Sequence, residues 1–183
     1  MSTVWSCGGG TQSAAMAALI IKGELPRPDL AVMADTGREA SEVKVFFDEV
    51  LYPELHKVGV NLYMLAHAFE VRGKLTEGRN TVDIYSGKDK NTIIMPMFTA
   101  QRGRGMLPKF CSNEWKSRPV QRFIREHGLT SGEIWIGFSI DEMERMRAYD
   151  PRQKWNHTYP LIDMRLTRGD CIALCEEIGR AHV

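Results

Sequence analysis

Three consecutive glycines occupy positions 8–10, between a short β-prone run and a segment rich in helix-forming residues. Because glycine has no Cβ atom, backbone N–H groups here can approach a ligand closely, and a helix that begins directly afterwards directs its positive end at an anion. The hydroxyls of Ser6, Thr11 and Ser13 add further donors. We call residues 8–13 the glycine loop and predict that this loop, together with Ser6 before it, binds the phosphate or phosphosulfate end of a nucleotide. A tight packing turn without a ligand is the alternative, since the loop matches neither the P-loop nor the dinucleotide-binding fingerprint.

Asp35 is a second candidate, because it directly follows an apolar run of strand length at 30–34. Open α/β sheets bind ligands beyond the carboxyl ends of their strands. The carboxylate of Asp35 could therefore hold Mg²⁺ or a ribose hydroxyl near the glycine loop. Capping of the following helix is the alternative.

Several cations are suited to phosphate or sulfate. Lys116, Arg118, Arg122 and Arg125 form one cationic stretch, and a solvated helix face is the alternative, more for Arg122 and Arg125 than for Lys116. Arg145 is a further candidate for substrate contact. Its spacing from the acidic residues three and four positions earlier also fits a surface ion pair within one helix.

The elements that must position these residues alternate between strands and helices. Short apolar runs predict strands at 3–6, 30–34, 61–66 and 133–137, and helical spacing predicts helices at 12–22, 41–58, 117–127, 141–147 and 167–178. Pro53 predicts a break near the end of the second helix, and Thr167 with Asp170 predicts a cap on the last. We therefore predict a single α/β domain over residues 1–183, a three-layer sandwich whose mostly parallel sheet has about five strands.

Composition and charge narrow the class of protein. A formal charge of +1 over 183 residues argues against a chain that binds nucleic acid with its whole surface, although a local basic patch stays open. Four scattered cysteines, no signal peptide and no apolar run of membrane-spanning length predict a cytoplasmic protein with reduced thiols and no membrane partner.

The glycine loop resembles the pyrophosphate-binding loop of the adenine nucleotide alpha hydrolases, a superfamily that includes phosphoadenosine phosphosulfate reductases, ATP sulfurylase small subunits and N-type ATP pyrophosphatases. The common Ser-Gly-Gly-x-Asp-Ser form of that loop aligns with residues 8–13. Gly8 replaces the first serine and Gln12 the acidic residue, which counts against a metal role at position 12.

Four more stretches resemble phosphoadenosine phosphosulfate reductase-like proteins, in the same order along nearly the whole chain. They are Asp35-Thr36-Gly37 with Glu39, the segment 105–111 with Lys116 and Pro119, the segment 135–145 with Gly137, Asp141, Glu142 and Arg145, and Trp155 with Tyr159-Pro160-Leu161-Ile162. The resemblance implies nucleotide contacts for the glycine loop, for Asp35 and Thr36, and for Gly137, Asp141 and Glu142.

The cysteines leave several interpretations open. Cys111 could be a nucleophile, a cluster ligand or a small buried residue, whereas Cys171 and Cys175 share one helical face, where core packing is favoured over a metal site. Reductases that resemble this chain carry a C-terminal Cys-Gly-x-His element, and many similar proteins have a Pro-rich CxxC segment. Neither is present, so sulfite formation is disfavoured and an iron–sulfur cluster is not expected in this chain alone.

Three functions follow as hypotheses. The first is an enzyme that cleaves or activates ATP at the alpha phosphate, with Lys116 and Arg145 as catalytic cations and Mg²⁺ as a helper. The second is a thiol-dependent phosphosulfate reductase or sulfurtransferase that uses Cys111. The third is a nucleotide-binding subunit without catalysis in a modification or defence system, which the loss of the acid at Gln12 favours slightly. A protein partner or a homo-oligomer is compatible with all three.

Overall fold

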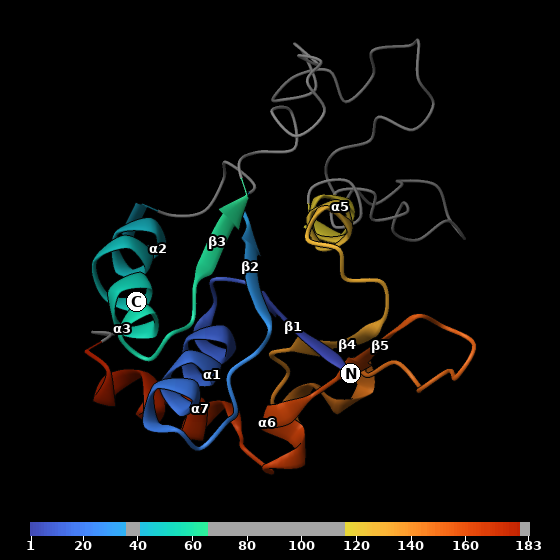
Figure 1. Ribbon diagram of the computed structural model, residues 1–183. Helices are drawn as coiled ribbons and strands as arrows, with labels where there is room; N and C mark the ends of the chain where they lie inside the picture. Colours follow the sequence, from blue (N-terminus) through green and yellow to red (C-terminus); the bar gives the residue numbers. More distant parts are fainter. Residues whose placement is uncertain (36–40, 66–115, 180–183) are drawn as a thin grey trace, which may run out of the picture. The chain divides into compact units, whose positions relative to one another are not determined.

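The computed structural model describes residues 1–35, 41–65 and 116–179 (Figure 1). Contacts divide the chain into two compact units. The first comprises Met1–Met33, Glu39–Met64 and Ile124–Val183, and the second comprises Ala34–Arg38 and Leu65–Phe123. The site described below is built from the first unit alone, and the single domain over residues 1–183 stays a prediction.

A five-stranded parallel sheet carries the fold. Its strands, in the spatial order β3-β2-β1-β4-β5, are β1 (Ser2–Cys7), β2 (Leu30–Ala34), β3 (Leu62–Leu65), β4 (Gly132–Ile136) and β5 (Trp155–Thr158). β1 pairs in parallel with both β2 and β4, and β4 pairs in parallel with β5. The predicted α/β class and the predicted number of strands are confirmed.

The order of the strands creates a switch point beside β1. The chain proceeds from β1 to β2 and β3 on one side, and then returns to place β4 against the other side of β1. The loops that leave the carboxyl ends of β1 and β4 therefore start as neighbours and diverge. Open α/β sheets bind ligands in the crevice at such a point.

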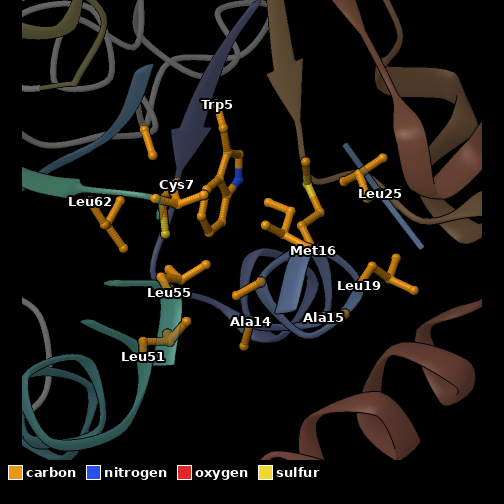
Figure 2. Packing of buried hydrophobic residues seen from close by; sticks show 14 of the residues in the cluster. Trp5, Cys7, Ala14, Ala15, Met16, Leu19, Leu25, Leu51, Leu55 and Leu62 are labelled. Atoms are coloured by element: carbon orange, nitrogen blue, oxygen red, sulfur yellow. The ribbon is translucent and has the colours of Figure 1, made fainter. Parts of the chain in front are cut away.

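Helix α1 (Thr11–Lys22) is buried on all its sides. Its alanines are covered completely or almost completely, as are Met16 and Leu19. α1 contacts α7 (Arg168–Glu177) and α3 (Tyr52–Lys57), and small side chains allow the close approach to α7. Figure 2 shows Trp5 and Cys7 of β1 in the same apolar cluster as Met16, with Leu51 and Leu55 nearby. A helix that is apolar all round is stable only in such a position.

The predicted helix over 41–58 forms three successive helical segments. α2 (Ser41–Phe46) passes into a π-helical turn, η1 (Phe47–Leu51), which continues as α3. Pro53 lies in the first turn of α3, where a residue without an N–H group is tolerated. The backbone N–H of Tyr52 bonds to the carbonyl of Phe47, so the wider π turn replaces the break that proline predicted.

Among the remaining helices, α5 (Arg118–Glu126) agrees with the predicted helix over 117–127 and carries Pro119 near its start. The predicted α-helix over 141–147 is instead a 3₁₀ helix, η3 (Ile140–Arg145). Thr167 and Asp170 form the predicted cap of α7, a reciprocal capping box that lowers the pKa of Asp170. β5 and the short α6 (Pro160–Asp163) were not predicted as elements. Among the helices described, none is both long and apolar enough to cross a membrane.

Gly132 begins β4 at a point where the backbones of two strands meet closely. Its φ angle is 156°, and a Cβ atom there would lie 2.0 Å from the carbonyl oxygen of Ser2, its partner in β1. A side chain would therefore separate the two strands whose loops form the switch point.

We expect Gly132→Ala to lower the free energy of unfolding by about 3 kcal/mol or more, because the clash is with backbone that cannot move aside cheaply. Gly169→Ala is the matched control, since its Cβ would make only an ordinary contact of 3.5 Å with Thr167. Urea unfolding of both variants checks the prediction, and an equal loss in the two would contradict it.

Candidate functional site

The glycine loop turns sharply at Gly9. This residue has a φ angle of 73°, which side chains disfavour, and a Cβ atom on it would lie 2.7 Å from the terminal methyl of Met33. The backbone N–H of Gly8 donates to the Ser13 hydroxyl over 2.8 Å and so closes the loop onto the first turn of α1. Gly9 and Ser13 therefore shape the loop, which begins at the carboxyl end of β1 as the sequence predicted.

Gly8 and Gly10 contribute an open backbone edge. Both are exposed, and a Cβ atom on Gly10 would meet nothing within 4 Å. Gly10 is the N-cap of α1, with no side-chain cap and no acidic residue in the first turn. The N–H groups at the start of an α-helix lack helical partners and carry its positive dipole end. An anion can approach them here without meeting a protein side chain on Gly10.

The loop after β4 lies against the same helix start. A Cβ atom on Gly137 would come within 3.3 Å of the carbonyl carbon of Gln12, the nitrogen of Ser13 and the sulfur of Met16. Glycine at this position therefore lets the end of β4 pack directly onto the first turn of α1. The two loops at the switch point are in contact through this packing.

A chain of polar and aromatic side chains connects the loops. The Gln12 amide donates to one carboxylate oxygen of Glu142 over 2.9 Å, and the other oxygen pairs with Arg145. The Arg145 guanidinium lies 4.3 Å from the ring centre of Phe138, a cation–π contact, and Phe138 stacks on Tyr159. Phe138 was not among the predicted site residues. An aromatic residue directly after Gly137 was the only signal in the sequence, and its partners become evident only from the fold.

Asp141 faces α7. One of its carboxylate oxygens accepts the backbone N–H of Arg168, over 2.5 Å, and the hydroxyl of the fully buried Ser139, over 3.3 Å. The carboxylate thereby joins η3 to the first turn of α7. This contact positions the turn that carries Glu142 and Arg145; a nucleotide contact for Asp141 stays a prediction.

Comparison of the sequence with protein-family models and with curated proteins gives no match. Comparison of the structure finds the crystal structure of phosphoadenylyl-sulfate reductase from Candida auris in a phosphate complex. It is 12% identical, with a TM-score of 0.58, and the match covers 97% of this chain and 72% of that chain. The chain has a phosphoadenylyl-sulfate reductase-like fold. The fold expected from the resemblance of the motifs is confirmed.

The three cysteines in the described part of the chain are buried. Cys7 lies at the end of β1, and Cys171 and Cys175 lie on the face of α7 that contacts α1, where the Cys175 sulfur is 3.4 Å from the Thr11 carbonyl oxygen. Burial, with Cys175 and acidic groups nearby, raises the pKa of Cys171 to about 11. The core-packing interpretation of Cys171 and Cys175 is confirmed. No group of three metal-binding side chains occurs in the part of the chain that the structure describes.

The other predicted residues are distributed over the chain. Asp35, half-buried directly after β2, and Lys116, exposed, belong to the second unit. Thr36 and Cys111 lie outside the described residues. Arg122 and Arg125 are exposed on α5, in agreement with the solvated-face interpretation. Ser6 is half-buried at the end of β1.

The expected Mg²⁺ ion does not fit the described residues around the glycine loop. Mg²⁺ prefers oxygen ligands in octahedral geometry, usually with one or two carboxylates. Gln12 supplies an amide in place of the acid, and both carboxylate oxygens of Glu142 are engaged. One oxygen of Asp141 is engaged by α7. A metal role for Asp35 is a separate proposal about the second unit.

We expect Cys7, Cys171 and Cys175 to resist alkylation by iodoacetamide at pH 8, because they are buried and Cys171 holds its proton up to a pH of about 11. All three should react once the chain is unfolded in guanidinium chloride. Peptide mapping by mass spectrometry checks this, with the unfolded sample as control. Rapid labelling of Cys171 in the native protein would contradict the burial.

The raised pKa of Cys171 also has a consequence for stability. The thiol ionises near pH 9.0 when unfolded but only near 11 when folded. Its contribution to stability is therefore complete below pH 9 and is lost as pH rises from about 9 to 11. Urea unfolding at pH 8 and pH 10 should show a smaller pH-dependent loss in Cys171→Ala than in the wild type, and an identical loss would contradict this prediction.

Proposed function

We propose that this chain binds the triphosphate or phosphosulfate end of an adenine nucleotide at the glycine loop and cleaves or activates the nucleotide at its alpha phosphate. The observation that carries the proposal is the open edge at Gly10, where a helix start without a side-chain cap directly follows three glycines. Two further observations support it. The loop lies at the switch point of a parallel sheet, and the fold is shared with a reductase whose structure contains phosphate.

The arrangement suits stabilisation of charge that develops on phosphate oxygens. The N–H groups of the first turn of α1 are held in place before a ligand arrives, so little reorganisation is needed during reaction. The Gly8 N–H already donates to the Ser13 hydroxyl and fixes the loop. The Arg145 guanidinium, half-exposed beside Phe138, supplies a cation at the same edge. When water attacks the alpha phosphorus, the bond to the bridging oxygen breaks and AMP and pyrophosphate result. When another acceptor attacks, it becomes adenylylated. A catalytic role for Lys116, which belongs to the second unit, is a separate proposal.

Phosphosulfate reduction is the second candidate function. The fold of the phosphoadenylyl-sulfate reductase favours it, whereas the described cysteines oppose it. Cys7, Cys171 and Cys175 are buried, and a thiol whose pKa is raised, as that of Cys171 is, is a poor nucleophile. A thiol route would therefore depend on Cys111. A binding subunit without catalysis is the third candidate, because Gln12 replaces the acid of the common loop.

Turnover of three nucleotides distinguishes these functions. ATP, adenosine phosphosulfate and its 3′-phosphorylated form would each be incubated with the protein and a thiol reductant, and AMP, pyrophosphate and sulfite would be measured. Calorimetric titration would measure the binding of each nucleotide. AMP with pyrophosphate from ATP is the expected result. Sulfite production that is lost in Cys111→Ser would establish the reductase instead. Binding without any product would indicate the non-catalytic subunit, and no binding of any nucleotide would refute the site.

Replacement of Gly10 tests the open edge directly. We expect Gly10→Ala to weaken binding of ATP by about tenfold or more, since the new methyl group occupies the space through which the phosphate reaches the helix start. The free energy of unfolding should change by no more than about 1 kcal/mol, because nothing in the protein meets that methyl group and only the N-cap preference is lost. Calorimetric titration and urea unfolding measure the two effects, and unchanged affinity would contradict the proposal.

A further inference from the structure

The carboxylate of Glu142 is the one group that contacts donors from both loops of the switch point in the described part of the chain. Its Oε2 accepts from the Gln12 amide on α1, at 2.9 Å, and its Oε1 pairs with the Arg145 guanidinium on η3. Three-quarters of the Glu142 side chain is covered, whereas the Arg145 side chain is 55% exposed. A single carboxylate thus holds a neutral donor and a cation beside the glycine loop.

We propose that Glu142 is a positioning residue that holds the Gln12 amide and the Arg145 guanidinium for an incoming phosphate group, and that this group is bound at the loop without a bridging Mg²⁺ ion. The inference rests on the proposed function, because it concerns how the same loop receives its ligand. Beyond that function, the inference specifies the form of the ligand: a free nucleotide anion, and not a nucleotide–metal complex.

The local charges support this assignment. A bridging Mg²⁺ ion requires carboxylate oxygens that are free to coordinate it. Here position 12 is uncharged, and the negative charge of Glu142 is offset by Arg145 and by the hydrogen bond from Gln12. An anion that approaches the helix start therefore meets N–H donors and a guanidinium, and the carboxylate of Glu142 beside it is already engaged by Gln12 and Arg145.

The hydrogen bond between Gln12 and Glu142 explains why glutamine suits position 12. An aspartate or glutamate at position 12 would direct a second carboxylate toward Glu142. Two carboxylates that share a site cannot both ionise without cost, and a cation or a proton between them removes the repulsion. The hydrogen bond between Gln12 and Glu142 avoids this repulsion and leaves the site free of a need for metal.

Arg145 is held by two contacts of different kinds. The ion pair with Glu142 sets the position of the guanidinium along the η3 turn, and the ring of Phe138 lies under its face. The contact between Asp141 and the first turn of α7 fixes η3 itself. Loss of the Glu142 carboxylate would therefore leave the fold intact but release the two donors from their common position.

The experiment measures binding of ATP and of inorganic pyrophosphate by calorimetry, in excess EDTA and again with Mg²⁺, with free ligand concentrations corrected for metal complexes. In the wild type we expect affinities that differ by less than about threefold between the two conditions, since position 12 is uncharged and both carboxylate oxygens of Glu142 are engaged. We expect Gln12→Asp to weaken metal-free binding by about tenfold, with recovery in Mg²⁺. Titration with Mn²⁺ alone should show binding only to Gln12→Asp.

Glu142→Gln tests the positioning role, and Glu144→Gln, an exposed neighbour on the same turn, is its control. We expect Glu142→Gln to weaken metal-free binding by about tenfold, and Glu144→Gln to leave it unchanged. The double variant Gln12→Glu/Glu142→Gln restores an amide–carboxylate pair in the reverse orientation. It should bind in a Mg²⁺-dependent manner, a change that a merely structural role of Glu142 would not produce.

The outcomes separate the inference from the function on which it rests. Wild-type affinity that rises tenfold or more with Mg²⁺ would overturn the metal-free site while the proposed nucleotide binding stands. Equal affinities in Glu142→Gln and Glu144→Gln would overturn the role of Glu142. Absence of wild-type binding in both conditions would overturn the proposed function as well.

Discussion

Burial of α1 on every side is the constraint on which the candidate site depends. The helix shares its apolar core with Trp5 of β1, and its run of alanines allows α7 to approach closely. It can neither slide nor tilt without opening the apolar core around Trp5, Met16 and Leu19. The amides at its N-terminus are therefore held still, and they lie close after β1 because only Gly8, Gly9 and Gly10 separate the strand from the helix. Rigid donors of this kind can bind or stabilise an anion without first being ordered.

The second loop of the switch point depends on the same helix. Gly137 packs on the first turn of α1, and Glu142 reaches Gln12 in that turn. η3 is fixed from its other side by the contact between Asp141 and α7, the helix that also covers α1. One buried helix thus sets the position of the glycine loop, of the turn that carries Arg145, and of the helix that supports this turn. The two neighbouring acidic residues have different contacts, Asp141 toward the fold and Glu142 toward the site.

Much of this arrangement was predictable from the sequence, because its signals are local. The glycines, the apolar run of α1, the end of that helix at Lys22 and the capping box at Thr167 each depend on a few neighbouring residues, and each is found where it was expected. β5 was missed because Trp155-Asn-His-Thr158 is short and shows no alternation; it becomes a strand through pairing with β4. The bond between Gln12 and Glu142 joins residues 130 positions apart, and no local pattern reports such a contact.

The central claim is that the open edge of the glycine loop receives the phosphate end of a nucleotide. The most direct measurement is the titration of ¹⁵N-labelled protein with inorganic pyrophosphate, followed by the amide resonances in NMR spectra. The account predicts that the amide resonances of residues 8–13 shift together and saturate with one affinity. The amide resonances of the turn that carries Glu142 and Arg145 should shift with the same affinity. Saturable shifts confined to another surface, such as the exposed arginines of α5, would contradict the account.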